Sequence, residues 1–477
     1  MPRPSLQEAC TKIVATVGPA CDSEGKLVEL IEAGVDVFRI NTAHGTRSEH
    51  EQTLANIRAA SDICGFSPAV LLDLAGPKIR LGNLVEDPLD CEVGRELTFI
   101  RGKQSGRANE LTSSYEQLVD ELDLGDRVML ADGTVALKVT SVSKDEAVCE
   151  VVAGGKVRSR QGINLPGVKL SVPAMLPKDI DNANWAAQNG IDFISLSFVR
   201  SPDDVVTLKK LISGHNSKAL VIAKIEKPEA LEHLEAIVDA TDGVMVARGD
   251  LGVEIDVAET PNAQKRIIRV CKEKLKPVIV ATQMLESMHH SSRPTRAEVS
   301  DVANAILDGT DACMLSGETA IGDYPIAAVK TMNRIMLCTE REMGRPNQGK
   351  HHINDRVHPI TTAVTEGATE IAESIGAKLV VIATRSGNTA WVKSQSRSRI
   401  PTLGASESQA TLRRMNLFWG IKPMSANDLD DTSSFIDTIC QWGREHAELH
   451  AGDHLVFVTG TGLVKKAHNQ VLVHTVS

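Results

Sequence analysis

Aromatic residues are scarce: they make up only 3% of the 477 residues, whereas hydrophobic residues as a whole make up 42%. The cores must therefore be built mainly from Val, Ile, Leu and Ala. No run of about 18 apolar residues is present, so no membrane-spanning helix is expected. The first eight residues are polar and contain two prolines, which does not match the apolar centre of a signal peptide.

Paired cysteines are also lacking. Nine cysteines are scattered from Cys10 to Cys440, and no C-x-x-C pair occurs. An odd number at wide spacing is typical of reduced thiols, which are small core residues more often than ligands. This pattern predicts a cytoplasmic protein.

Positive charge is in deficit, with a formal net charge of -10 and a pI near 5.8. Such a field would repel nucleic acids and anionic membranes, so neither is expected as a partner. The chain also lacks a Walker A motif and a G-x-G-x-x-G segment that opens a helix. An anionic small-molecule substrate then requires local Arg, Lys or metal ions.

What the chain does contain is an alternation of strand-like and helix-like segments. Three apolar segments of strand length precede residue 78, and five more follow residue 173. They are residues 11–17, 35–40, 69–74, 193–196, 220–225, 243–247, 277–281 and 312–315. Eight such strands with intervening helices predict a (β/α)₈ barrel, whose active site lies at the carboxyl ends of the strands. An open, doubly wound sheet is the alternative.

The alternation is interrupted once and then gives way to a second α/β segment. Residues 78–173 show short strands with turn signals at Asp132-Gly133 and Gly154-Gly155, which predicts an inserted all-β domain. After a polar stretch at 345–355 come one helix and four strands, predicted at 363–374, 379–383, 400–403, 454–458 and 470–474. The predicted domains are the barrel (1–77 and 174–343), the lid (78–173) and the C-terminal domain (344–477).

Polar side chains gather where the predicted barrel strands end. Lys224 and Glu226 are two residues apart and share one strand face, and Asp250 ends the next strand. Carboxylate oxygens suit Mg²⁺ or Mn²⁺, while Lys224 and Arg39 suit phosphoryl oxygens. Phosphoryl transfer needs mainly positioning and charge neutralisation. The alternative for Lys224 and Glu226 is a surface ion pair. At two other strand ends, hydroxyl and carboxyl groups suit a proton relay: Thr282, Ser316 and Glu318.

At these positions the chain resembles the pyruvate kinase family, from residue 11 onward. The similar blocks are residues 224–226, 245–252, 281–288, 294–299 and 315–320. The resemblance implies a barrel with a β lid inserted after its third strand and a C-terminal α/β regulatory domain. It further implies a glycolytic kinase that uses Mg²⁺ or Mn²⁺ to convert phosphoenolpyruvate and ADP to pyruvate and ATP, assembled as a homotetramer.

The resemblance also implies roles for individual residues. Lys224 would stabilise the transferring phosphoryl group, and Glu226 and Asp250 would hold the metal. The backbone N–H groups of Gly249 and Asp250 would bind the substrate carboxylate, and Thr282 would lie at the protonated face of the enolate. Arg39 would bridge the substrate phosphate to lid residue Asp132. The implied nucleotide contacts are Asn41, His44, Arg80, Thr16 and Pro19.

Two departures from the family pattern are informative. Many relatives bind K⁺ through an Asn-x-Ser unit, an Asp-Thr pair and a nearby glutamate, but this chain carries Ala43, Leu74 and Lys78 there. The Lys78 ammonium is expected to substitute for the ion, which predicts K⁺-independent activity. Gln161 replaces a lysine that often contacts the nucleotide, which puts one lid contact in doubt.

A loop in the C-terminal domain predicts a phosphate site. Residues 384–389 join a strand to a helix, and the helix start offers backbone N–H groups. Its candidate ligands are Thr384, Ser386, Asn388 and Thr389. An ordinary capped turn is the alternative. The family's second effector loop, here residues 460–466, matches poorly.

Two other functions remain open from sequence alone. A metal-dependent lyase of the same barrel class would need neither the lid nor Lys224. A catalytically silent regulatory relative would be expected to lose Lys224, Glu226, Asp250 or Thr282, and all four are present.

Overall fold

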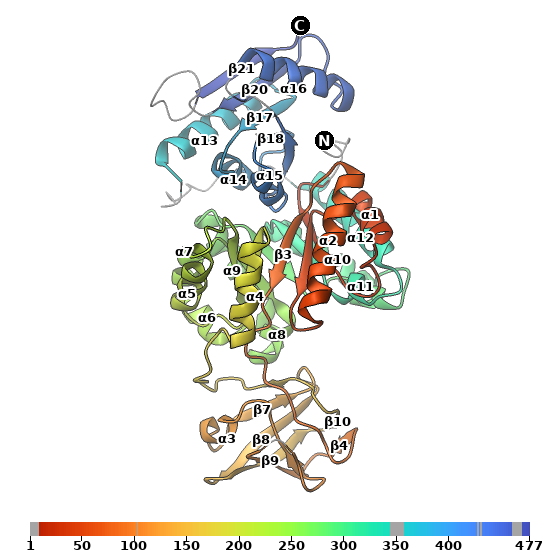
Figure 1. Ribbon diagram of the computed structural model, residues 1–477, viewed down its shortest axis with the longest axis vertical. Coiled ribbons are helices and arrows are strands. Elements are labelled where there is room, and N and C mark those ends of the chain that lie inside the picture. The colour runs from red at the N-terminus through yellow and green to blue at the C-terminus, as the bar shows by residue number, and fades with distance from the viewer. Residues whose placement is uncertain (1–8, 103, 344–356, 427–428, 430–431, 460–469) are drawn as a thin grey trace.

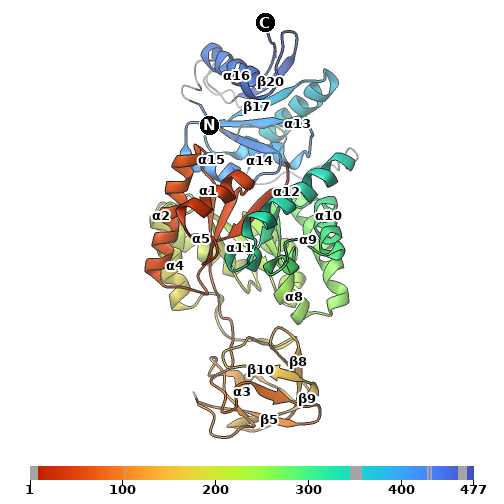
Figure 2. The ribbon, with the colours of Figure 1, turned by 90° about the vertical axis from the view of Figure 1, so that its right-hand side faces the viewer.

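The protein has three parts arranged along one long axis, as the computed structural model shows (Figure 1). The structure describes residues 9–102, 104–343, 357–426, 429, 432–459 and 470–477. A barrel lies in the middle, a β domain hangs from one end, and an α/β domain covers the other end (Figures 1 and 2). The chain enters the β domain after the third barrel strand, so this domain lies at the carboxyl end of the barrel.

The central part is a closed barrel of eight parallel strands. The strands are β1 (Lys12–Thr16), β2 (Val37–Asn41), β3 (Ala69–Asp73), β12 (Phe193–Leu196), β13 (Leu220–Ile225), β14 (Gly243–Ala247), β15 (Val278–Ala281) and β16 (Ala312–Leu315). Pairing of β1 with β16 closes the cylinder. The (β/α)₈ prediction is confirmed, and the open sheet is excluded.

Helices separate the barrel strands and cover them from outside. They are α1 (Glu24–Ala33), α2 (Arg47–Cys64), α4 (Pro177–Gln188), α5 (Pro202–Ser213), α6 (Pro228–Glu232), α7 (Leu234–Ala240), α8 (Arg248–Glu254), η1 (Val257–Glu259), α9 (Thr260–Glu273), η2 (Glu286–His289), α10 (Arg296–Asp308), α11 (Gly317–Ala320) and α12 (Pro325–Glu342). Local signals set their ends: Thr46 and Glu49 form a capping box at the start of α2, and Gly65 ends it in the left-handed conformation.

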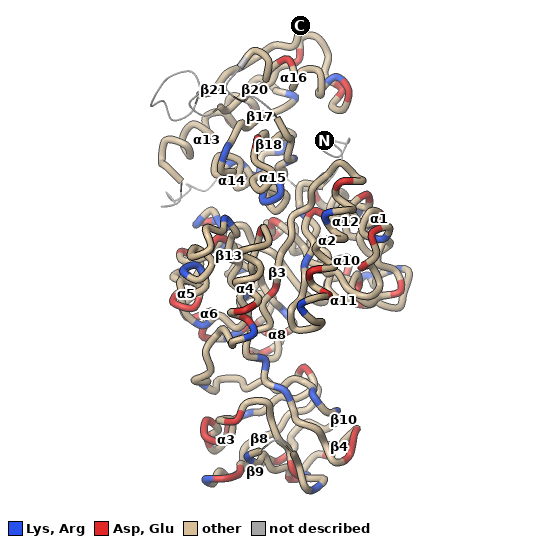
Figure 3. The backbone as a smooth tube through the Cα atoms, viewed as in Figure 1, with Lys and Arg blue, Asp and Glu red and all other residues tan. Residues whose placement is uncertain are grey.

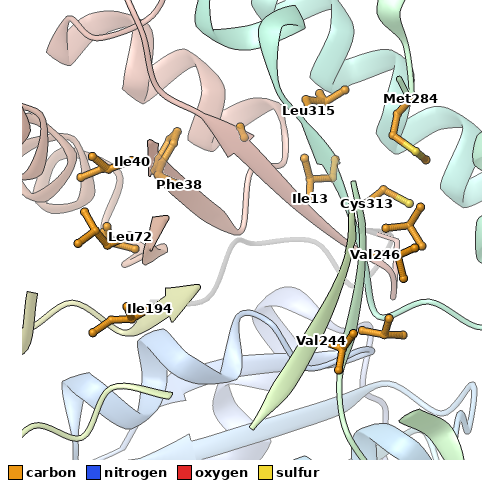
Figure 4. Close-up of a cluster of buried hydrophobic side chains, with 14 of the residues drawn as sticks. Ile13, Phe38, Ile40, Leu72, Ile194, Val244, Val246, Met284, Cys313 and Leu315 are labelled. Atoms are coloured by element: carbon orange, nitrogen blue, oxygen red, sulfur yellow. The ribbon is translucent and has the colours of Figure 1, made fainter. Parts of the chain in front are cut away.

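The two faces of each barrel strand have different partners. Outward side chains such as Phe38, Leu72 and Val246 pack against the helices (Figure 4). Inward side chains at the amino-terminal end of the barrel are also apolar, and they share a core with the C-terminal domain. The barrel is therefore filled with apolar side chains below its carboxyl end, and the charged residues at its amino-terminal end, such as Lys12 and Asp192, contact the C-terminal domain.

The inserted β domain follows β3, as predicted. Its six-stranded sheet has the order β11-β7-β8-β9-β5-β6, and β10 pairs with β4 beside it. The elements are β4 (Leu89–Cys91), β5 (Glu96–Ile100), β6 (Glu110–Leu111), α3 (Leu118–Glu121), β7 (Arg127–Leu130), β8 (Val135–Val142), β9 (Glu146–Ala153), β10 (Gly155–Val157) and β11 (Ile163–Asn164). Ala131 and Asp132 both have positive φ in the β7–β8 hairpin, as a type I′ turn requires.

The C-terminal domain is a five-stranded sheet of order β19-β18-β17-β20-β21, in which only the β20–β21 pair is antiparallel. Its elements are α13 (Pro359–Ser374), β17 (Leu379–Ala383), α14 (Asn388–Gln395), β18 (Thr402–Ser406), α15 (Gln409–Met415), β19 (Ile421–Ser425), α16 (Thr432–His446), β20 (His454–Thr459) and β21 (Gln470–Thr475). Strand β19 was not predicted, because Pro423 interrupts it; an edge strand tolerates that proline. The predicted strand at 400–403 begins and ends later, and the linker at 345–355 lies outside the described residues.

The C-terminal domain docks on the amino-terminal end of the barrel. Trp391 of α14 donates its ring N–H to the Leu275 carbonyl at 2.5 Å, and Arg413 pairs with buried Asp192 at 2.9 Å. Lys12 donates to the Ile421 carbonyl at 2.9 Å. Because α14 begins at the predicted phosphate loop, that loop is one helix away from the barrel.

Charged residues of both signs are intermixed along the chain (Figure 3). Within the described ranges, no helix is both long enough and apolar enough to cross a membrane.

Candidate active site

The candidate site arises where the inward-facing side chains of the barrel strands change from apolar to charged. Every second residue of a strand points inward. In β3, apolar Leu71 is followed two residues later by Asp73, and in β13 Ile222 is followed by Lys224. The carboxyl end of the barrel is therefore lined by charge above an apolar floor.

Asp73 lies at the centre of this charged layer, with a side chain only 2% exposed. Its Oδ2 accepts hydrogen bonds from Arg39 Nε at 2.9 Å and Nη2 at 2.5 Å, and its Oδ1 accepts one from Ser195 at 2.6 Å. Burial opposes ionisation, but the Lys224 and Arg39 cations outweigh it, so the pKa of Asp73 is lowered. Asp73 is therefore a buried carboxylate that orients two cations.

Lys224 is buried beside three oxygen-bearing side chains. Its Nζ lies 2.8 Å from Glu226 Oε1, 2.7 Å from Ser197 Oγ and 3.5 Å from Asp73. Burial alone would lower the pKa of Lys224, but the Asp73 and Glu226 carboxylates more than offset this, and the pKa is raised. The ammonium is therefore protonated at neutral pH. The alternative of a solvated surface ion pair is excluded by burial, because Lys224 is 9% exposed and Glu226 is 1% exposed.

The carboxylates of Glu226 and Asp250 fit a divalent cation. Glu226 is 1% exposed, and its Oε1 has no hydrogen-bond partner among the described residues apart from the ion pair with Lys224. Burial raises the pKa of Glu226, Lys224 opposes this, and Asp250 adds to the rise. A bound cation would offset the burial of the Glu226 carboxylate and its repulsion by Asp250. No cluster of three His, Cys, Asp or Glu residues suited to a metal occurs in the described ranges. Two carboxylates with substrate oxygens and water are a ligand set typical of Mg²⁺.

Lys78 reaches this site from the base of the lid. Its Nζ lies 3.2 Å from Asp250 Oδ1, and both side chains are about a third exposed or less. The lid residue Gly162 lies between Lys78 and Asp132, where an added Cβ would be 3.3 Å from the lysine chain.

The structure does not bring Asp132 to Arg39. Asp132 lines a cavity of about 550 Å³ with Arg248 and Gly249, while Arg39 forms hydrogen bonds with Asp73 and Thr16.

Thr282 is held at the start of α8. Its Oγ1 accepts the Gly249 N–H at 2.8 Å, and its carbonyl accepts Arg248 Nη2 at 2.7 Å. Thr282 and Gln283 have φ values of 70° and 56°, which are unfavourable for residues with side chains. Strained backbone of this kind concentrates at functional sites, and Arg248 is the side chain that fixes it here.

Ser316 and Glu318 follow strand β16, and Glu318 contacts the loop that follows Thr282. The Glu318 carboxylate accepts the Ser316 N–H at 2.7 Å and the Leu285 N–H at 3.1 Å, and it is 1% exposed. Ser316 Oγ is buried, with no hydrogen-bond partner among the described residues. Glu318 thus ties the end of β16 to the segment that follows Thr282.

Of the predicted nucleotide residues, His44 lies in a positive region. Burial, and then the charges of Arg80, Arg39 and Lys78, lower the pKa of His44. Arg80 donates a hydrogen bond to the Arg160 carbonyl at 3.2 Å within the lid base. The side-chain oxygen of Asn41 accepts the Ala43 N–H at 3.1 Å. Pro19 is exposed, whereas Thr16 is buried and donates to the Leu315 carbonyl at 3.0 Å.

Lid and barrel are joined directly by a buried polar group that the sequence analysis did not identify. Lys227 pairs with Glu254 at 2.6 Å, and lid residue Asn164 donates to the same carboxylate oxygen at 3.0 Å. Glu254 is the last residue of α8, so the lid is tied to the helix that carries Gly249 and Asp250. Gln161 instead folds onto its own turn, accepting Arg158 N at 2.7 Å.

The predicted phosphate loop is a well-formed turn before α14. Gly387 has φ 90° and donates its N–H to Thr384 Oγ1 at 3.0 Å, and Asn388 N lies 3.4 Å from Ser386 Oγ. Both hydroxyls are thus already used locally, as the capped-turn alternative requires. Thr389 is buried. Residues 460–466 lie outside the described residues.

Family profiles match most of the chain. A profile described as "Pyruvate kinase, barrel domain" matches residues 8–329, and one described as "Pyruvate kinase, alpha/beta domain" matches residues 362–474. The chain belongs to the pyruvate kinase family. Membership confirms the resemblance found in the sequence and makes the protein a kinase among the transferases.

Individual pyruvate kinases are similar over nearly their full length. The protein from Mycobacterium tuberculosis is 42% identical over 449 residues, covering 94% of each chain. That from Geobacillus stearothermophilus is 38% identical over 471 residues, covering 98% of this chain and 80% of the relative. A crystal structure of a pyruvate kinase from Cryptosporidium parvum superposes with a TM-score of 0.91 at 33% identity, covering 99% and 97% of the two chains.

Within this pyruvate kinase fold, several positioning residues were not predicted. Ser195, Ser197 and Arg248 contact Asp73, Lys224 and the Thr282 loop, respectively. Ser195 and Ser197, at the end of β12, have the same period-two spacing as Lys224 and Glu226 at the end of β13. That spacing could have identified both serines, but in a sequence a neutral hydroxyl group cannot be told from an ordinary polar residue of the core.

Proposed function

We propose that this chain transfers the phosphoryl group of phosphoenolpyruvate to ADP, giving pyruvate and ATP. The observation that carries the proposal is the buried, protonated Lys224 beside the carboxylates of Glu226 and Asp250. A fixed cation in a water-poor site stabilises charge that develops on the transferring group far better than a solvated one does. Family membership supports the same reaction.

Different residues of the chain have different roles in this reaction. Lys224 and Arg39 contact the phosphoryl oxygens, and the N–H groups of Gly249 and Asp250 hold the substrate carboxylate. Glu226 and Asp250 would hold Mg²⁺ or Mn²⁺, which when bound would supply positive charge to neutralise the substrate oxygens. Thr282, Ser316 and Glu318 deliver a proton to C3 of the enolate, and Asp73 orients Arg39 and Lys224.

The nucleotide is placed on the positive region around His44 and Arg80, together with Asn41, Thr16 and Pro19. Closure of the lid would carry Asp132 toward Arg39, in keeping with the role of lids in excluding water.

A homotetramer is part of the proposal. Some apolar side chains of the barrel are exposed, including Val257 (74%) and Leu307 (56%). Such side chains are more common at subunit contacts than on free surfaces.

The direct test is pyruvate formation from phosphoenolpyruvate and ADP with Mg²⁺. A lyase would consume phosphoenolpyruvate or an oxo acid without any need for ADP, so omission of ADP separates the two enzyme classes. Binding of phosphoenolpyruvate without turnover would instead indicate a silent regulatory relative.

We expect the reaction to proceed without K⁺, because the Lys78 ammonium already places a fixed positive charge 3.2 Å from Asp250. Lys78→Glu should create a K⁺ requirement, since it replaces that cation with an anion able to bind one. The measurement is kcat in tetramethylammonium buffer with and without added KCl. A large K⁺ stimulation of the unmodified enzyme would contradict the assignment.

We further expect regulation by a phosphorylated effector at Thr384, Ser386, Asn388 and Thr389. The support is the position of this loop at the start of α14, whose Trp391 contacts the barrel at Leu275. Unchanged kinetics with sugar phosphates and with AMP would contradict it.

A further inference from the structure

His289, at the end of η2, lies between solvent and the buried acid–base residues of the site. Its side chain is 20% exposed. The ring Nδ1 lies 3.8 Å from the exposed carboxylate of Glu286, and the ring Nε2 lies 3.9 Å from Glu318 Oε2. The two ring nitrogens therefore face two carboxylates, one in water and one in the interior.

Two polar atoms at the buried end of this arrangement lack hydrogen-bond partners among the described residues. His289 Nε2 and Ser316 Oγ are both buried, and neither has a hydrogen-bond partner within the described part of the chain. The ring packs directly on Gly317, where an added Cβ would overlap it. Glycine between Ser316 and Glu318 thus allows an imidazole to approach both residues, and buried polar atoms without partners are uncommon enough to call for a function.

We propose that His289 is the solvent-side member of the proton relay that ends at the enolate; the inference rests on the function proposed above. Protonated His289 gives its Nε2 proton to the Glu318 carboxylate, Glu318 gives a proton to Ser316 Oγ as the Ser316 hydroxyl proton leaves toward the Thr282 side, and that proton forms the new C3–H bond. The enolate electron pair forms this bond, and its oxygen becomes the ketone carbonyl. His289 is then reprotonated from water past Glu286, so the net transfer is one proton from solvent.

The distances suit a relay that tightens when substrate binds. Catalytic hydrogen bonds are often long in ligand-free structures and shorten in the reactive complex. A shift of about 0.7 Å would bring the 3.9 Å gap between His289 Nε2 and Glu318 Oε2 into hydrogen-bond range.

The test is the exchange of the methyl hydrogens of pyruvate with D₂O, followed by proton NMR with Mg²⁺ and inorganic phosphate present. His289→Ala should lower the exchange rate about tenfold or more, as expected for loss of a positioned proton carrier. Added imidazole should restore much of it by occupying the vacated space. His289→Gln, which keeps a polar side chain but carries no transferable charge, should show the same loss.

His290 provides a matched control. It is the next residue, its side chain is 84% exposed, and it contacts Asp323 at 3.1 Å rather than the site. His290→Ala should exchange like the unmodified enzyme and should not respond to imidazole. The KM for phosphoenolpyruvate and the Tm should stay close to the unmodified values in all three variants.

Two results would overturn the relay while leaving the proposed function intact: exchange by both His289 variants at the unmodified rate, or a loss in His289→Ala that imidazole does not restore, which would make His289 a packing residue. Failure of the unmodified protein to form pyruvate would instead reject the proposed function itself.

Discussion

Lys224→Met is expected to lower kcat for pyruvate formation by about three orders of magnitude or more, the range seen when a cation that stabilises a transferring phosphoryl group is removed. Methionine has nearly the same length and is apolar, so the buried volume stays filled. The charge is lost from a site where water cannot replace it, because Lys224 is 9% exposed and its ammonium contacts only protein oxygens among the described residues. Asp73 would still be paired with Arg39.

The informative comparison is between turnover and binding. Mn²⁺ and phosphoenolpyruvate should still bind, measured by calorimetry, since Glu226 and Asp250 remain. Lys26→Met is the control, because Lys26 is an exposed lysine that pairs with Glu29 within α1. Turnover by Lys224→Met at the unmodified rate would defeat the role assigned to this lysine. Lys224→Arg should also be impaired, because a planar fork does not reproduce a point charge 2.7 Å from Ser197.

The barrel could be predicted because its signals are local. Each strand is a short apolar run followed by a polar residue, and helix ends carry capping residues such as Thr295 with Glu298. Strand β19 lacked such a signal, since Pro423 is unfavourable in a strand and is tolerated only because β19 is at a sheet edge. Helices α15 and α16 were also not predicted, and most other errors are shifts of strand and helix ends, where local signals are weakest.

The site could be predicted only in part, because much of it depends on contacts between strands. Lys224 and Glu226 share one strand, so their proximity follows from spacing alone. The central position of Asp73 depends instead on the register that places it beside Ser195 and Asn41 in neighbouring strands. The positive φ of Thr282 is imposed by Arg248 and Gly249, and nothing in the residues 281–284 predicts it.

Asp73→Asn should combine a large loss of stability with a large loss of activity. The carboxylate accepts hydrogen bonds from Arg39 and Ser195 and faces the Lys224 ammonium. An amide is neutral and must direct its NH₂ group toward a donor, which leaves buried cations without their shared anion. Breaking a buried charge network by removing one partner costs about 3–5 kcal/mol. The measurement is the free energy of unfolding in denaturant, with exposed Asp181→Asn as the control.

The pH dependence of that loss has a definite sign. The pKa of Asp73 is lowered in the folded protein from an ordinary value of 3.8, so the unfolded chain takes up the proton first as pH falls. The stabilisation is therefore complete above about pH 4 and declines as the pH falls from there toward the folded-state pKa. The stability difference between the unmodified enzyme and Asp73→Asn should be constant near neutrality and shrink in acid.

The activity of Asp73→Asn should fall as well, because the Asp73 carboxylate makes the largest favourable contribution to the raised pKa of Lys224. In Asp73→Asn, turnover should then be lost at a lower alkaline pH than in the unmodified enzyme, and an unchanged alkaline limit would show that Asp73 does not sustain the Lys224 charge.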